Sequence, residues 1–270
     1  MPENWTKTLK RVSRRYSSCY WFAAQVFQYF ESNKLQNLRV LEDEVLIDYL
    51  VKHKKSLIRW GDGETAVLYG NDLMFQDFDP MLKKEMLFIL TDHKNNPSFI
   101  LGINHQFICF SLDDYMKQSK KRQKMWRVTR YVMHKFCSLK SVYGDTLLFR
   151  PYSNVENKDF EKLWGGKHVV LISSESDHAD KILNRTHAKS VHQIKIPSKN
   201  SYQIIDNVMD RTLKLINELS YDRNEIRVLI SGGPAGKVLA HRLILMDCIV
   251  YDVGHYFTWK IDGKTNEKGI

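Results

Sequence analysis

The chain has 270 residues, of which 43% are hydrophobic, 27% charged and 12% aromatic, with only 13 Gly and 6 Pro. This composition excludes collagen-like, low-complexity and disordered proteins and predicts a globular chain with a sizeable core, in one large domain or two small ones. Lys and Arg number 41 against 31 Asp and Glu, a formal net charge of +10. That excess favours an anionic partner, which could be nucleic acid, a phosphorylated small molecule or an acidic membrane surface.

The cysteines and the N-terminal apolar run indicate the cellular compartment in which the protein is expected to work. Cys19, Cys109, Cys137 and Cys248 are far apart and form no C-x-x-C pair, which favours reduced thiols in the cytoplasm and argues against a Cys-ligated zinc site. An apolar run from Cys19 to Phe30 follows basic residues, but Gln25 and Gln28 interrupt it. We expect neither a cleaved signal nor a membrane span here, and a helix packed on the domain is favoured over an interfacial membrane anchor.

Residues 1–50 are predicted to be a helical N-terminal extension and residues 51–270 one domain. In the first half of that domain, Ser56–Trp60 is predicted to be a strand that a tight loop, Gly61–Glu64, separates from a helix. Further strands are predicted at Ser98–Ile103 and Thr146–Phe149.

A basic amphipathic helix is predicted from Met116 to Lys140, with residues such as Lys120, Arg127 and Arg130 on its polar faces. A solvated basic face is the favoured interpretation, and contact with phosphates or a membrane is the alternative.

The second half of the chain alternates between short apolar runs and helical patterns. Strands are expected at Val169–Ile172, His192–Ile196, Ile226–Ile230 and Cys248–Val253, and helices at Asp177–His187, Tyr202–Leu219 and Ala235–Met246. This order predicts an α/β fold with a mainly parallel sheet covered by helices on both faces. Ligands of such a fold bind beyond the carboxyl ends of the strands.

Two carboxylates follow the first predicted strand. Asp62 and Glu64 can converge on one hard cation, and Gly61 and Gly63 let the backbone and a ligand approach each other closely. A surface turn is the alternative explanation of the same residues.

A glycine-rich turn, Ser231–Lys237, leaves a later strand and enters a helix. It matches neither G-x-x-x-x-G-K-[ST] nor G-x-G-x-x-G. Gly232 and Gly233 could still direct backbone N–H groups toward a phosphate, with Lys237 as a nearby positive charge. A tight turn with Pro234 near the helix start is the alternative.

Two further strand ends carry polar residues. His255 follows the last strand with Asp252 nearby, and it could ligate a metal or exchange a proton, or be structural. Lys199 and Asn200 could contact phosphate and a sugar hydroxyl, or simply begin a helix. No G-x-S-x-G or H-E-x-x-H motif and no nucleic-acid-binding signature is present.

Four stretches together resemble the GT-D-type bacterial glycosyltransferases. They are Arg59-Trp60-Gly61-Asp62-Gly63-Glu64, Pro197-Ser198-Lys199-Asn200, Ser231-Gly232-Gly233-Pro234-Ala235-Gly236 and Asp252-Val253-Gly254-His255. The resemblance covers roughly residues 41–259 and implies a Rossmann-like domain. It also implies a nucleotide-sugar donor, a UDP-sugar being favoured, and a glycan or glycoconjugate acceptor in surface polysaccharide or glycoprotein biosynthesis.

In this family, Asp62 and Glu64 match the D-x-E metal motif and would hold Mn²⁺ or Mg²⁺, with His255 as a further candidate ligand. Arg59, in the same motif, would orient the carboxylates or contact phosphate. Asp62, Glu64, Asp252 and His255 are the candidates for a catalytic base. The resemblance implies no nucleic-acid partner, and the basic segments suit an enzyme at the inner face of a membrane.

Two alternatives have other chemistry. One is a non-catalytic basic module that binds nucleic acid or an anionic membrane, which predicts steep salt dependence and indifference to substitution of Asp62. The other is a nucleotide-binding hydrolase on the same scaffold, since a fold does not fix a reaction.

Overall fold

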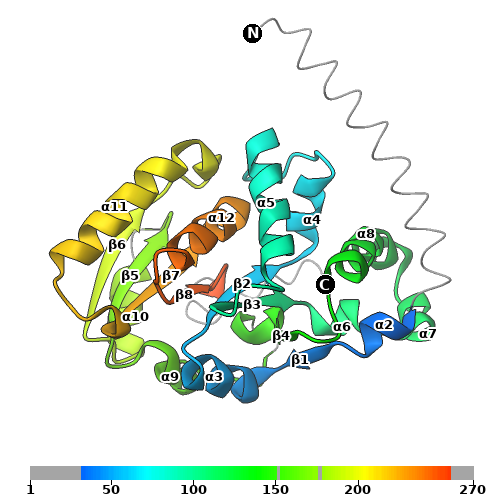
Figure 1. Ribbon diagram of the computed structural model, residues 1–270, viewed down its shortest axis with the longest axis horizontal. Helices are drawn as coiled ribbons and strands as arrows, with labels where there is room; N and C mark the ends of the chain where they lie inside the picture. Colours follow the sequence, from blue (N-terminus) through cyan, green and yellow to red (C-terminus); the bar gives the residue numbers. More distant parts are fainter. Residues whose placement is uncertain (1–31, 151–152, 176–177, 257–270) are drawn as a thin grey trace, which may run out of the picture.

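A computed structural model describes residues 32–150, 153–175 and 178–256. The expected α/β class is confirmed, because eight parallel strands form one sheet in the order β1-β4-β3-β2-β8-β7-β5-β6 (Figure 1). The strands are β1 (Arg39–Leu41), β2 (Ser56–Trp60), β3 (Phe99–Ile103), β4 (Val142–Asp145), β5 (His168–Ser173), β6 (Ser190–Lys195), β7 (Ile226–Ser231) and β8 (Val250–Asp252).

Helices cover both faces of this sheet. The α-helices are α2 (Ser32–Gln36), α3 (Asp43–Lys52), α4 (Asp62–Leu68), α5 (Pro80–Asp92), α6 (His105–Ile108), α7 (Leu112–Met116), α8 (Lys120–Phe136), α9 (Glu161–Trp164), α10 (His178–Arg185), α11 (Ile205–Glu218) and α12 (Gly233–Ile244). Short 3₁₀ helices are η1 (Thr146–Phe149), η2 (Asn157–Phe160), η3 (Ser201–Ile204) and η4 (Arg223–Glu225).

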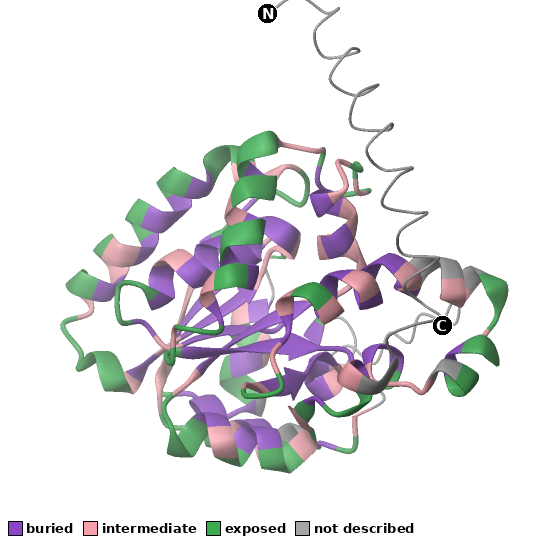
Figure 2. Ribbon diagram, turned by 45° about the vertical axis from the view of Figure 1, so that its right-hand side comes forward, coloured by how far each residue is buried: buried purple, intermediate pink, exposed green. Residues whose placement is uncertain are grey.

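Two apolar cores lie on opposite faces of the sheet. One contains residues of α5, α8, α11 and α12, and the other contains residues of α3, α9 and α10. Buried positions therefore run through the middle of the molecule, with exposed positions on the outer faces of the helices (Figure 2). All five residues of β2 and of β3 are buried, which explains why neighbouring positions in these strands are apolar, without a regular alternation of apolar and polar residues.

The first 50 residues are not helical throughout. Within the described part, Arg39–Leu41 forms the edge strand β1, which pairs with β4, and α3 runs across the expected boundary at residue 50. Three residues are too few to show a strand period in sequence. The apolar run from Cys19 to Phe30 lies outside the described residues.

The strand expected at Thr146–Phe149 is displaced. The strand is β4, Val142–Asp145, and Thr146–Phe149 is the 3₁₀ helix η1. The Asp145 side chain accepts a hydrogen bond from Leu147 N at 2.9 Å. This side-chain cap turns the chain out of the strand, and the apolar residues of η1 are buried without being part of the sheet.

The basic helix is interrupted and only partly solvated. Ser119 caps α8 separately from α7. Arg130, expected on the basic polar face, is buried instead and donates to the carbonyls of Phe107 and Ile108, at 3.0 and 2.7 Å. The Arg130 guanidinium group therefore donates hydrogen bonds to backbone carbonyls at the C-terminal end of α6 that have no partner within the helix. Among the described helices, none has both the length and the hydrophobicity that a bilayer crossing requires.

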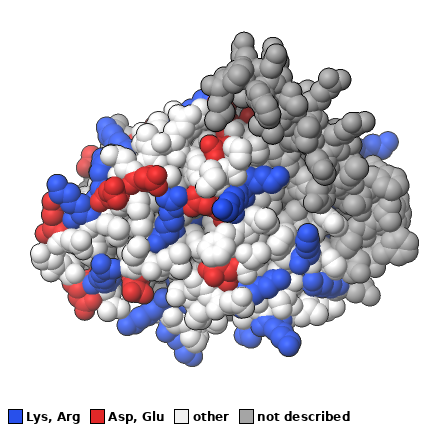
Figure 3. Space-filling view, turned by 45° about the horizontal axis from the view of Figure 1, so that its top comes forward, with Lys and Arg blue, Asp and Glu red and all other residues white. Residues whose placement is uncertain are grey.

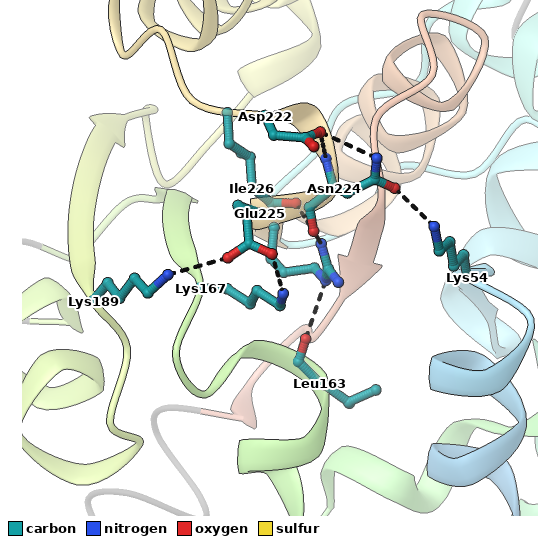
Figure 4. Close-up of polar contacts among 9 residues, drawn as sticks. Lys54, Leu163, Lys167, Lys189, Asp222, Asn224, Glu225 and Ile226 are labelled. Atoms are coloured by element: carbon teal, nitrogen blue, oxygen red, sulfur yellow. Dashed lines mark hydrogen bonds and ion pairs between the residues drawn. The ribbon is translucent and has the colours of Figure 1, made fainter.

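Charged residues fix the amino ends of three strands. Lys167, Lys189 and Glu225 each directly precede a strand, β5, β6 and β7. Glu225 is 2.6 Å from Lys167 and 3.1 Å from Lys189 (Figure 4), and these two hydrogen-bonded lysines lower the pKa of Glu225 to about 2. This network lies at the sheet edge opposite to the one where ligands of parallel sheets bind.

We expect Phe160→Ala to lower the free energy of unfolding by about 3–5 kcal/mol, because a buried aromatic leaves a cavity when it is truncated. The Phe160 ring is fully buried, with ring centroids 5.3 Å from Phe149, 5.6 Å from Trp164 and 5.0 Å from Tyr256. Urea unfolding measures the change. Phe88→Ala, at a ring that is 54% exposed, is the matched control. Equal losses in the two variants would contradict the packing of this cluster.

We expect His93 to make stability depend on pH between about 4 and 6.5. Burial lowers the pKa of His93 from 6.5 to about 4, so the unfolded chain binds the proton more tightly in that window. Stability must then rise with pH across the window, by up to about 3 kcal/mol. Chemical unfolding at several pH values should show a shallower slope in His93→Gln, whereas His53→Gln, at an exposed position, should keep the wild-type slope.

Candidate functional site

Three neighbouring strands bring sequence-distant residues together. In the sheet, β2, β8 and β7 are adjacent. Arg59 is on β2, with Asp62 and Glu64 just after it, Asp252 ends β8, and Lys237 is in the first turns of α12 after β7. Arg59, Glu64, Lys237 and Asp252 therefore lie together at the carboxyl edge of the sheet.

A buried ammonium group joins two of these segments. Lys237 Nζ lies 3.0 Å from Glu64 Oε1 and 3.2 Å from Asp252 Oδ2. The side chain of Asp252 is 1% exposed and that of Lys237 is 6% exposed. Burial opposes the charge of Asp252, but Lys237 and then Arg59 outweigh it and lower the pKa of this carboxyl. Asp252 is therefore ionised and held at the centre of the site.

Arg59 contacts Asp252 in two ways. Its backbone N donates to Asp252 Oδ2 at 3.2 Å, and its side-chain Nε lies 3.7 Å from the same oxygen. The Arg59 Nη1 atom also donates to the carbonyl of Thr146 at 3.4 Å. Arg59 thus holds the carboxylate of Asp252 and also contacts the segment after β4. Its predicted role of orienting Asp62 and Glu64 or contacting phosphate stays a prediction.

Asp62 and Glu64 lie in the first turn of α4 and not in a loop. Glu64 Oε2 accepts the backbone N–H of Gly61 at 2.8 Å, which closes the start of the helix, while its other oxygen faces Lys237. Burial and then the charge of Glu64 raise the pKa of Asp62. The Asp62 carboxylate thus lacks full charge compensation, and Asp252 Oδ1 is buried without a hydrogen bond. An incompletely compensated carboxylate such as that of Asp62 is a group that a divalent cation can bind.

His255 and Gly254 complete the β8 end of the site. Gly254 has φ of +52°, and a Cβ there would lie 1.6 Å from Arg59 Nη2, so only glycine fits beside the guanidinium group. Desolvation by the surrounding protein and the charges of Arg150, Arg59 and Lys237 lower the pKa of His255 to about 4. Its imidazole is neutral at pH 7, which is the form that binds metals.

The glycine-rich turn has the expected place between β7 and α12. Gly232 precedes the helix, Gly233 has φ of +56°, and Pro234 is in the first turn. The Phe75 ring packs directly on Gly233, where a Cβ would come within 2.7 Å of it. The turn therefore presents backbone and no side chain at the N-terminus of a 12-residue helix, an arrangement suited to an anion.

Lys199 and Asn200 contact a different partner. Asn200 N donates to the Phe75 carbonyl at 2.9 Å, and the Asn200 side chain exchanges two hydrogen bonds with Asp77, both at 2.8 Å. Lys199 lies 3.4 Å from the same Asp77. In this structure the two residues hold the loop between α4 and α5 across the edge of the sheet. The contacts of Lys199 with phosphate and of Asn200 with a sugar hydroxyl stay predictions.

Arg150 also lies at this site, although its sequence context does not predict a functional role. Its positive charge acts on Asp62, Glu64 and Asp252, and burial followed by the charge of Arg59 lowers its own pKa to about 10. The Arg150-Pro151-Tyr152 stretch lies within the family resemblance but shows no chemical pattern by itself. Only the fold shows that it borders the carboxylates.

A second group of metal-binding side chains lies farther along the same edge. Glu42, His105 and Asp145 have one ligand atom each within 4.8 Å of one another, the one such trio in the described residues. Asp62, Glu64 and His255, the predicted metal ligands, do not form such a trio. Burial raises the pKa of Asp145 to about 6.

Comparison with known proteins identifies the family. Residues 57–261 match the family described as "Glycosyltransferase GT-D fold". The chain belongs to the GT-D glycosyltransferases. The expected resemblance is thereby confirmed, and with it the assignment to a class of transferase enzymes.

Relatives and solved structures agree with this family. "Glycosyltransferase GlyD" of Streptococcus pneumoniae is 29% identical over 84% of the chain, and "Probable glycosyl transferase Gly" of Streptococcus gordonii is 24% identical over 82%. The chain covers only 28% and 32% of those two proteins.

Two solved structures share the fold. "A New Glycosyltransferase (DUF1792) from Streptococcus sanguinis" has a TM-score of 0.68 and 22% identity, covering 86% of this chain and 88% of that one. "The highly conserved domain of unknown function 1792 has a distinct glycosyltransferase fold" describes another, with a TM-score of 0.69, 21% identity and coverage of 90% and 88%.

We expect Lys237→Met to lower the free energy of unfolding by about 3–5 kcal/mol, because it leaves buried carboxylates without their cation. Adding Asp252→Asn to Lys237→Met should recover part of that loss. Chemical denaturation of the two single variants and the double variant measures the coupling. Additive losses in the double variant would show that Lys237 and Asp252 do not interact.

Proposed function

We propose that this GT-D domain transfers a sugar from a nucleotide donor, a UDP-sugar being favoured, to a glycan or glycoconjugate acceptor. The observation that carries the proposal is the balance of charges at the edge of the sheet. Asp62, Glu64 and Asp252 face the three cations Arg59, Arg150 and Lys237. A nucleoside diphosphate accompanied by a divalent ion adds opposite charges to such a site and preserves its balance.

Asp62 and Glu64 are the residues that would hold Mn²⁺ or Mg²⁺, with His255, which follows β8, as a further candidate ligand. When bound, the ion supplies positive charge that stabilises the departing diphosphate. Asp252 is too buried to reach an acceptor, so its role is to orient Arg59 and Lys237. The basic side chains and the backbone of Gly232 and Gly233 would bind the phosphates.

The loop between α4 and α5 supports a donor site in this place. Phe75 covers one side of the glycine-rich turn, and Asp77 is held by Asn200. A ligand at the turn is thus partly enclosed, which limits the access of water to the donor. Exclusion of water favours transfer to an acceptor over hydrolysis.

We also propose that the enzyme acts in surface polysaccharide or glycoprotein biosynthesis, in the cytoplasm beside an anionic membrane. The support for this is the basic composition of α8 and of the chain as a whole. On the face drawn in Figure 3, acidic and basic side chains lie beside one another.

We expect one nucleotide, presented with Mn²⁺, to raise the melting temperature of the wild type and to have no such effect on Asp62→Asn. A ligand at 100 times its Kd adds about 2.7 kcal/mol to stability. Differential scanning fluorimetry with a panel of nucleoside diphosphates and nucleotide sugars identifies the ligand. Asp210→Asn, at an exposed position on α11, is the matched control and should respond as the wild type does.

The alternatives predict different outcomes. Binding that falls steeply with salt and persists in Asp62→Asn would support the basic module. Release of free sugar from the donor, undiminished by a panel of glycan acceptors and lost in Asp62→Asn, would support the hydrolase. Acceptor-dependent formation of a glycoside supports the transferase.

A further inference from the structure

The trio of Glu42, His105 and Asp145 is placed by three adjacent strands. In the sheet, β1, β4 and β3 are neighbours. Glu42 directly follows β1, Asp145 ends β4, and His105 begins α6 just after β3. The paired registers Leu41 with Gly144 and Ile103 with Asp145 fix these strand ends relative to one another. The trio is therefore a product of the fold and not of one flexible loop.

Asp145 is positioned as a ligand before any ion binds. The residue is 4% exposed, and its Oδ1 atom accepts backbone hydrogen bonds from Leu147 at 2.9 Å and His105 at 3.4 Å. Among the described residues, no hydrogen bond is made to its Oδ2 atom. Because both of these hydrogen bonds fix Oδ1, the second oxygen of the carboxylate takes part in neither and can be offered to a cation.

His105 and Glu42 supply the other two ligand atoms. His105 Nδ1 lies 2.8 Å from Glu42 Oε1. Ligand atoms about 2.1 Å from one ion are at most about 4.2 Å apart, and the three ligand atoms here all lie within 4.8 Å of one another. The Glu42 side chain is 51% exposed and has room to move inward.

A second His–Glu pair, His187 with Glu161, provides a comparison in which no third ligand is present in the described residues. His187 Nδ1 lies 2.9 Å from Glu161 Oε1, and the His187 side chain is 80% exposed. In the part of the chain that the structure describes, no third ligand joins this pair. The pair at His105 differs because a buried carboxylate completes it.

We propose that Glu42, His105 and Asp145 bind a divalent transition metal ion of the zinc type, at a site separate from Asp62 and Glu64. One imidazole and two carboxylates suit such an ion, and three protein ligands leave a position for water. Asp145 leads directly into η1, whose Thr146 carbonyl accepts a hydrogen bond from Arg59. The ion would thus fix a segment that borders the carboxylates of the main site. This inference does not rest on the proposed transferase activity.

Calorimetric titration of the chelator-treated protein with Zn²⁺, without nucleotide, tests the site. We expect one wild-type binding event whose affinity falls at least about tenfold in His105→Ala and in Glu42→Gln. His187→Ala, the matched exposed histidine, and Asp62→Asn should bind as the wild type does. Co²⁺ in place of Zn²⁺ gives a visible absorption band that should weaken in the same two variants.

The outcomes separate the two metal sites. Wild-type binding in both His105→Ala and Glu42→Gln, or binding that only Asp62→Asn removes, would overturn the proposal. Absence of a binding event in a wild-type protein that melts cooperatively would do the same. Because Glu42 is exposed, Glu42→Gln should fold even where a substitution of buried Asp145 does not.

Discussion

The carboxyl ends of β2, β8 and β7 lie side by side and bring charged side chains together. The buried ammonium group of Lys237 neutralises the carboxylates that meet there. Lys237 lies between Glu64 and Asp252, which are supplied by different strand ends. Removing Lys237 deprives both carboxylates of the ammonium group that they share, at a cost of several kcal/mol. The position of α12, the start of α4 and the orientation of Arg59 all depend on this contact. The site is therefore part of the packing of the sheet.

The two edges of the sheet use charge differently. At the amino edge, Glu225 with Lys167 and Lys189 forms a partly exposed network that water screens, and it aligns strands at little cost (Figure 4). At the carboxyl edge, Asp252 and Lys237 are almost fully buried, so desolvation is not offset by water. A cost of that kind is typical of functional edges, where fixed charges meet a ligand. The carboxyl edge, where we propose that the donor binds, thus differs from the amino edge in its electrostatics as well as in its topology.

Much of the fold could be predicted because its strands are buried on both faces. β2 and β3 have apolar runs that mark them in sequence, and β7 enters α12 through glycines. Features set by tertiary contacts could not be predicted in this way. Nothing local distinguishes Arg150 from other basic residues, and Asn200 lies beside a strand end but binds Asp77. The pairing of Arg130 with the end of α6 likewise depends on the approach of two helices.

Two carboxylate clusters at one edge imply two kinds of ligand. Around Asp62, cations match the carboxylates in number, so an ion can enter only together with an anion such as a diphosphate. Around Asp145, the charges that act come from Glu42 and His105, without a Lys or Arg. A cation entering there would meet two carboxylates whose neighbouring group is His105, 2.8 Å from Glu42. The difference in neighbouring charge, more than the identity of the side chains, distinguishes the proposed donor site from the proposed second metal site.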